Sequence, residues 1–348
     1  MEAHTNRPAL LPTTGYLKGP LFDGLLIIFS PLLGLLLAKA IANTWITDEV
    51  LHGTDSLATI VLGTLLSGHL VITFLRSHAN TTIFKAWPLR FTLVPLLLLV
   101  GMLTSTWFLV VVGIITTFWD EWHSGAQTFG LCRLYEVRAG NDPTTGRRLD
   151  LWMNMVIWFG PLLGGVTLMD HAYGLGEDFA GIAPTLLYAI PVYAGLWQQV
   201  ITGLMLGIGL LSVVVYVALT WRMIQRGHRV SLQKVALLVT TGLVSLYAWG
   251  FNSFGEAFFI MNVFHYAQYF GIVWLTERKT LMGRLHLPQT PIGTAAALAA
   301  FLVGALIIGF ALDRIPVTGS TSMAFFLLLS LVHFWYDGFI WSVRKKMV

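Results

Sequence analysis

Long apolar stretches separated by short polar connections run along almost the whole sequence. About 20 apolar residues suffice to cross a bilayer as an α-helix, because a helix rises about 1.5 Å per residue and the hydrocarbon layer is about 30 Å thick. The pattern therefore predicts an all-α, polytopic transmembrane helical bundle of about ten spans. The predicted spans are 21–43, 56–76, 89–104, 106–132, 151–171, 191–220, 232–250, 254–276, 291–312 and 322–343.

Two of the connections carry further expectations. The third span is short and is expected to form a tight hairpin with the fourth, and residues 178–190 are expected to be a half-helix or re-entrant piece before the long sixth span. Residues 1–20 are predicted to be a cytoplasmic N-terminal segment, 21–343 the transmembrane domain and 344–348 a cytoplasmic tail.

Basic residues gather in every second connection, and acidic residues in most of the others. The positive-inside rule assigns basic connections to the cytoplasm, so both termini are predicted to be cytoplasmic. We expect an integral, multi-pass protein of a bacterial inner membrane. The basic segments are 76–90, 133–148, 222–234, 278–284 and 344–346.

Composition agrees with a membrane protein and excludes some chemistries. Charged residues make up 11% of the chain, against about 25% in a soluble domain. The net charge of +4 arises from short connections, so nucleic acid is not an expected partner. The single cysteine, Cys132, rules out a disulfide within the chain and an iron–sulfur cluster held by four thiolates.

Four histidines fall inside predicted spans, at a similar depth: His69, His123, His265 and His333. If the topology holds, all four lie roughly 10–18 Å from the cytoplasmic ends of their helices, in the inner half of the bilayer. Ionisable residues at membrane depth are costly and usually mark a working site. Imidazole is the commonest metal ligand among side chains, so the sequence predicts a site at which these four side chains are metal ligands.

Acidic and amide side chains accompany three of these histidines at helical spacing. Asp120 and Gln127 share a helix face with His123, Gln268 lies three residues after His265, and Asp337 lies four after His333. These four residues are predicted to act in catalysis, either as oxygen ligands or as partners that orient the imidazoles. A proton relay or a metal-free substrate site is the alternative, and the roles of His52, His78 and His171 stay open.

Dispersed histidines on several spans resemble those of the histidine-rich integral-membrane iron enzymes, which include the membrane desaturases and hydroxylases and the Brp/Blh carotene-cleaving dioxygenases. The string His52-Gly53-Thr54-Asp55 is similar to the His-Gly-x-x-Asp element of the Brp/Blh family. The resemblance implies non-haem iron, as one or two ions, and a lipophilic substrate such as a lipid or isoprenoid. The paired-histidine boxes of desaturases are absent from the sequence, which favours fewer ligands per metal.

Three functions are compatible with these residues. The first is a membrane-embedded, metal-dependent oxidoreductase of the oxygenase, hydroxylase or desaturase type, working with an electron donor. The second is an electron-transfer protein that binds haem b through two histidines on facing helices. The third is a proton-coupled transporter, in which Pro161 and Pro191 would mark broken helices.

Overall fold

The computed structural model describes residues 15–41, 57–165, 184–252, 254–317 and 319–341. These residues are 86% helical and include no strand. The helices are α1 (Pro20–Asp23), α2 (Ser30–Ile41), α4 (Leu57–Phe74), α5 (Thr81–Ala86), α6 (Pro88–Thr104), α7 (Thr106–Arg138), α8 (Arg147–Gly164), α10 (Pro184–Gln225), α11 (Leu232–Phe251), α12 (Phe254–Arg284), α13 (Pro291–Asp313) and α14 (Ser320–Ile340), with π-helical turns η1 (Gly24–Ile28) and η2 (Leu75–Ala79). His52, His171 and the His-Gly-x-x-Asp string lie outside the described residues.

Within the described ranges, six helices are long and apolar enough to cross a membrane. They are α10, α11, α12, α13, α14 and the continuous run of α4 into η2. The helices α1 and η1 with α2 make a seventh candidate, bent by 61°. These helices are those of a multi-pass membrane protein, but fewer than the span number expected from the sequence. Two other predicted spans carry more charge: α7 contains Asp120 and Glu121, and α8 begins with Arg147 and Arg148.

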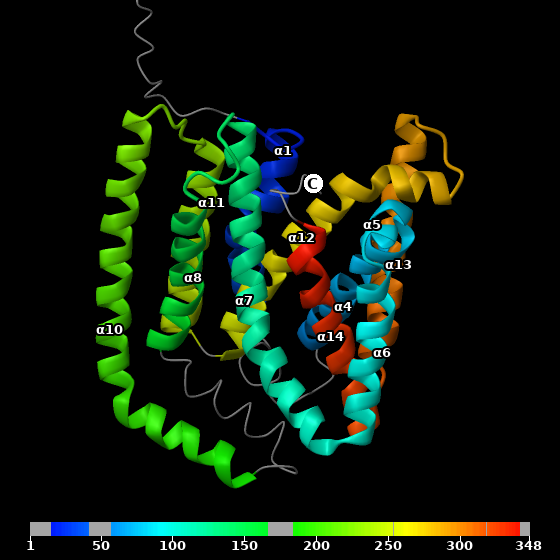
Figure 1. Ribbon diagram of the computed structural model, residues 1–348, viewed down its shortest axis with the longest axis horizontal. Coiled ribbons are helices and arrows are strands. Elements are labelled where there is room, and N and C mark those ends of the chain that lie inside the picture. The colour runs from blue at the N-terminus through cyan, green and yellow to red at the C-terminus, as the bar shows by residue number, and fades with distance from the viewer. Residues whose placement is uncertain (1–14, 42–56, 166–183, 253, 318, 342–348) are drawn as a thin grey trace, which may run out of the picture.

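The expectations for individual connections have different outcomes. The hairpin between α6 and α7 is confirmed, with Ser105 alone between the two helices. The Ser105 side chain accepts a hydrogen bond from the Phe108 amide at 3.3 Å and so caps α7. Of the half-helix or re-entrant piece expected at 178–190, only residues 184–190 are described; they are helical and begin α10, which bends sharply in Figure 1 before its long apolar part, Trp197–Gln225.

Helix α12 is the centre of the bundle. It runs obliquely across the molecule (Figure 1) and packs against α2, α4, α11 and α13. In its apolar stretch 72% of the residues are buried, whereas in α10, at the edge of the bundle beside α8, the share is 6%. A site built around α12 is therefore shielded from both lipid and water.

Close contact with α13 fixes the position of α4. A Cβ at Gly309 of α13 would lie 2.3 Å from the carbonyl oxygen of Thr64, so only glycine allows this approach. Gly68 of α4 lies against Ala305 in the same interface. This packing positions the neighbouring His69 on the side of α4 that faces the centre of the bundle.

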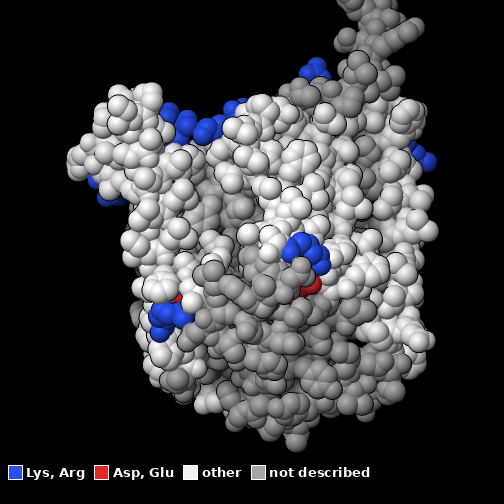
Figure 2. All heavy atoms as spheres, turned by 180° about the vertical axis from the view of Figure 1, so that it is seen from behind, with Lys and Arg blue, Asp and Glu red and all other residues white. Residues whose placement is uncertain are grey.

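The described basic connections lie at one end of the molecule. The α7–α8, α10–α11 and α12–α13 connections all lie at the upper end in Figure 1, and Figure 2 shows most Lys and Arg along that end. This is the arrangement that the alternation of charges along the sequence predicts. That this end faces the cytoplasm stays a prediction.

Candidate metal centre

Four helices bring the four predicted histidines together. His69 comes from α4, His123 from α7, His265 from α12 and His333 from α14. The ring centroids of His69 and His333 lie 4.7 Å apart, and those of His123 and His265 lie 5.1 Å apart. All four side chains are buried. The convergence expected from their similar depth is thus present.

The donor atoms of these rings fall into two overlapping groups, each of which could hold a metal ion. The Nε2 atoms of His123 and His333 are 3.1 Å apart, a separation that two ligands with bonds of about 2 Å to one metal can adopt. Two groups of three residues each place one donor atom within 4.8 Å of the others: His69, His265 and His333, and His123, His333 and Asp337. Because the groups share His333, we treat the five residues as one site, the His/Asp cluster.

Asp337 presents one oxygen to the cluster and anchors the other. Its Oδ1 accepts hydrogen bonds from the Tyr269 hydroxyl and the Trp341 indole, both at 2.9 Å. Its Oδ2 lies 3.9 Å from the Nε2 atoms of both His123 and His333. Hydrogen bonds to one oxygen fix the carboxylate orientation, so the second oxygen is directed toward the two imidazoles.

Several buried ring nitrogens in the cluster have no hydrogen-bond partner. The Nδ1 of His69 lies 2.6 Å from the Leu66 carbonyl oxygen, which assigns the proton to Nδ1 and leaves the lone pair on Nε2. That Nε2, both ring nitrogens of His265 and the Nδ1 of His333 are buried and unpaired. Because buried polar atoms are nearly always paired, this set of unpaired nitrogens is typical of a site prepared for a ligand.

The two predicted glutamines lie beside the cluster and connect helices. Gln127 donates from Nε2 to the His265 carbonyl oxygen at 3.0 Å and to the Gln268 side-chain oxygen at 3.2 Å. Gln268 in turn donates to the Ile27 carbonyl oxygen at 3.1 Å, in the widened turn η1. Their hydrogen bonds hold α7, α12 and η1 together around His265, and neither glutamine reaches an imidazole through these bonds.

Two other predicted residues lie apart from the cluster. Asp120 belongs to neither group of potential ligands. His78 packs against an aromatic group that includes Phe74 and Phe91, at ring distances of 5.0 and 5.5 Å. Of the acidic side chains predicted to accompany the histidines, only Asp337 lies within the cluster.

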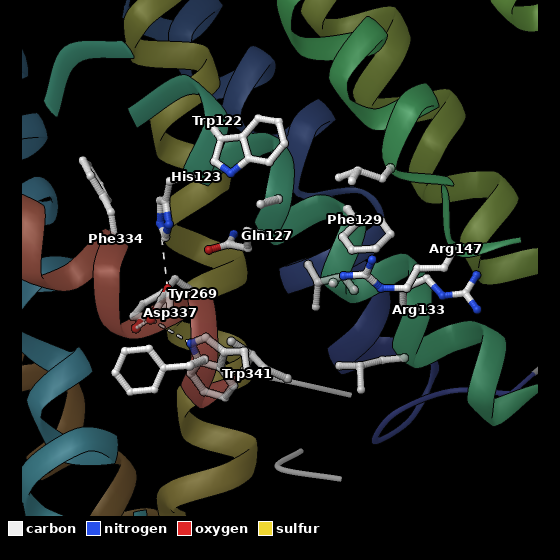
Figure 3. Close-up of a pocket in the computed structure, with 18 of the residues that line it drawn as sticks. Trp122, His123, Gln127, Phe129, Arg133, Arg147, Tyr269, Phe334, Asp337 and Trp341 are labelled. Atoms are coloured by element: carbon white, nitrogen blue, oxygen red, sulfur yellow. Dashed lines mark hydrogen bonds and ion pairs between the residues drawn. The ribbon is translucent and has the colours of Figure 1, made fainter. Parts of the chain in front are cut away.

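A cavity of about 460 Å³ adjoins the cluster. His123, Tyr269 and Asp337 line one end, and Arg133 and Arg147 line the other (Figure 3). The walls between them are mainly apolar side chains from α7 and α14: Trp119, Trp122, Phe129, Leu134, Phe334 and Phe339. Its volume is in the range of small-molecule sites, which span about 300–1,000 Å³.

No protein-family model, curated protein or solved structure matches the chain. The site is therefore interpreted from its own geometry.

Sequence reasoning missed two residues that support the cluster. Thr73, four residues after His69, donates to Asp337 at 3.4 Å and accepts from Tyr269 at 2.8 Å. Trp341, four residues after Asp337, donates to that carboxylate. Both follow a predicted site residue by one helical turn, so the same spacing that identified Gln127 and Asp337 could have identified them.

A buried ion network lies beyond the arginine end of the cavity; it comprises Arg133, Glu136, Asp150, His228 and Lys234. Lys234 bridges Glu136 at 2.7 Å and Asp150 at 2.8 Å, and Arg133 pairs with Asp150. Burial on its own raises the pKa of Glu136, but the hydrogen bond with His228 and the ammonium of Lys234 outweigh it and lower that pKa to about 2. The network joins α7, α8 and α11 at the end where the basic connections lie.

Proposed function

We propose that the chain is a membrane-embedded, metal-dependent oxidoreductase of the oxygenase, hydroxylase or desaturase type. In this proposal the His/Asp cluster holds non-haem iron, as one or two ions, and a lipophilic substrate occupies the adjoining cavity. The observation that carries the proposal is the meeting of four imidazoles and one oriented carboxylate, from four separate helices, beside an apolar cavity.

The donor types favour iron that activates oxygen. His123, His333 and Asp337 supply two imidazoles and one carboxylate, the ligand set of non-haem iron oxygenases that keep open coordination positions. His69 and His265, whose ring centroids lie 5.4 Å apart, add two further imidazoles to the cluster. When bound, iron would supply the binding and activation of oxygen at these open positions.

The protein's own residues hold and shield the reacting groups. Tyr269 and Trp341 orient Asp337, so that little reorganisation is needed when the carboxylate binds an ion. Tyr269 also lines the cavity, and its hydroxyl donates a hydrogen bond to Thr73 at 2.8 Å. Burial of all four imidazoles excludes water, which protects a reactive centre from side reactions.

The surroundings favour a lipophilic substrate. The walls of the cavity are mostly aromatic and aliphatic, and Trp122 is 45% exposed on the outer surface of α7, where lipid is expected. A substrate could therefore enter from the bilayer. Oxidation of this kind also needs electrons, so we include an electron donor in the proposal. We also propose that the protein lies in a bacterial inner membrane.

The packing of the four rings is unfavourable for haem b. Two histidines that ligate one haem iron lie on opposite faces of the porphyrin, so their nitrogens are about 4 Å apart with bonds of about 2 Å. The Nε2 atoms of His123 and His333 are closer, at 3.1 Å. His69 and His265 pack beside these rings at centroid distances of 4.7 and 5.1 Å, which leaves the four imidazoles crowded together.

Activity with a lipophilic substrate tests the proposal. Protein purified in detergent and loaded with iron should consume oxygen when given a reductant and a suitable lipid or isoprenoid mixture. Tyr269→Phe removes the hydroxyl that orients Asp337 while keeping the buried ring, and should lower the rate about 10–100-fold. Transport activity in metal-free protein, with no oxygen uptake by the iron-loaded protein, would contradict the proposal and favour a proton-coupled transporter.

A further inference from the structure

The end of the cavity away from the His/Asp cluster carries a cation suited to an anionic group. We propose that the molecule bound here is a single-chain amphiphile with an anionic head, whose head pairs with Arg147 and whose apolar chain extends along the cavity toward Asp337. That this amphiphile is the substrate rests on the proposed function. Its binding, however, can be measured without any reaction.

Arg147 is positioned and available for such a head. Its guanidinium lies over the ring of Phe129, 5.3 Å from the centroid, at the wall of the cavity (Figure 3). None of the described carboxylates pairs with it. Arg147 is also the first residue of α8, where the free amides of a helix N-terminus add positive potential. The side chain is exposed, so an anion reaches it without losing all of its water.

The neighbouring Arg133 shows by contrast why Arg147 is the recognition residue. Arg133 also lines the cavity, but it is buried and pairs with Asp150. Its Nη2 donates to three carbonyl oxygens of the α7–α8 connection, among them Thr145 at 2.8 Å. Only its Nε lacks a partner. Arg133 therefore has a structural role in the cavity wall. Arg147, at the edge of the cavity, has a positive charge that none of the described carboxylates pairs with.

Helix geometry sets the distance between the head and the cluster. His123 and Arg133 line opposite ends of the cavity from the same helix, α7. Ten residues of α-helix measure about 15 Å. An extended chain advances about 3.5 Å for every three bonds, so 15 Å corresponds to about a dozen bonds. The cavity thus matches a long acyl or isoprenoid chain whose anionic head is about a dozen bonds from the part beside Asp337.

Photoaffinity labelling of the purified full-length chain tests this proposal. The probe is a long-chain fatty acid with a diazirine about a dozen bonds from the carboxylate. Its methyl ester, with the same chain and no charge, is the matched control ligand. We expect the acid to label α7 and α14 around Trp122 and Phe334, and unlabelled fatty acid to compete. Arg147→Gln should weaken binding of the acid about tenfold, because the variant loses the positive charge that pairs with the carboxylate.

The neighbouring Arg148 provides a matched control variant. It is exposed and adjacent in sequence but does not line this cavity. Arg148→Gln should leave the affinity for the acid unchanged, and Arg147→Gln should leave the weaker labelling by the methyl ester unchanged. The proposal is overturned if acid and ester compete equally in the wild-type protein, if both arginine variants lose the same affinity, or if the label lies outside the cavity.

A second labelling experiment identifies the chemical class of the anionic head group. It also tests this inference separately from the proposed function. A single-chain lysophosphatidate replaces the fatty acid: tighter competition identifies a phosphate ester, and weaker competition a carboxylate. Labelling is performed on chelator-treated protein, so it does not depend on iron. Arg147-dependent binding without iron uptake would support the inference and refute the metal proposal, whereas iron uptake with equal binding of acid and ester would do the reverse.

Discussion

Replacing His333 with Ala should abolish metal binding while leaving most of the protein folded. His333 is fully buried and belongs to both groups of potential ligands. Its loss leaves two donors in each group, below the three protein ligands of a typical catalytic metal site. Loss of an outer partner alone costs about 10–100-fold in metal affinity, so loss of this shared ligand should cost more than about 100-fold.

Leu331→Ala is the matched control on the same helix. Leu331 lies two residues away in α14 and is 6% exposed, so its truncation also leaves a buried cavity. A buried Leu→Ala change typically costs about 2–5 kcal/mol. We expect both variants to unfold at lower temperature in detergent, and only the Leu331 variant to keep its iron.

Metal content by mass spectrometry, measured beside the thermal unfolding midpoint, distinguishes a ligand from a packing residue. Iron at wild-type levels in the His333 variant would show that His333 is not a ligand. It would then contradict the proposal of an iron enzyme, since His333 belongs to both groups of potential ligands. Equal loss of iron in both variants would show that the metal responds to packing alone.

Three further predictions concern the carboxylate, the ion network and the topology. Asp337→Asn keeps an oxygen for Tyr269 and Trp341 but offers an amide to the imidazoles. Iron affinity should therefore fall about 10–100-fold, less than for His333→Ala. A wild-type affinity in an iron titration would refute the role of Asp337. Because the folded pKa of Glu136 is about 2, below the unfolded value of about 4.3, its stabilising effect is present above pH 4.3 and is lost as pH falls toward 2. The difference in unfolding midpoint between wild type and Glu136→Gln should therefore shrink over that window, and a constant difference would contradict the assignment. A cysteine at the exposed Thr144 should react with a membrane-impermeant reagent only from the cytoplasm, and one at the exposed Val317 only from outside; the reverse pattern would overturn the orientation.

Much of the site could be predicted from the sequence because helical spacing and depth are regular. A similar depth in the membrane is predicted from the position of each intramembrane histidine along its span. The structure brings the four rings together: His69, His123, His265 and His333. The i, i+4 spacing of His333 and Asp337 likewise predicted their proximity. Such inferences need only the helix repeat and the length of each span.

Other features depend on helix rotation and on contacts between distant segments. Asp120 lies three residues before His123 on the same helix, yet it belongs to neither group of potential ligands, because sequence spacing does not fix how each side of α7 is turned toward its neighbours. Gln268 donates to the carbonyl oxygen of Ile27, which lies in the π-helical turn η1. A pattern of apolar residues does not predict such a turn. Arg147 and Phe129 form the cavity edge only because α7 and α8 are packed together.

The span number illustrates a different limit. Apolar length alone made α7 a predicted span, yet Asp120 and Glu121 within it keep it outside the set of six helices that are apolar enough to cross a membrane. Such acids are tolerated when neighbouring helices cover them, which a sequence read one span at a time does not reveal.

Metal analysis of the purified chain, combined with its optical spectrum, shows whether the His/Asp cluster binds non-haem iron. We expect about one iron ion per chain, or two at most, bound by the His/Asp cluster, and no Soret band. Iron should be retained after washing in detergent and be absent from the His333→Ala variant. Protein that binds no iron when supplied with it, or that shows a Soret band, would refute the assignment of the His/Asp cluster as a non-haem iron centre.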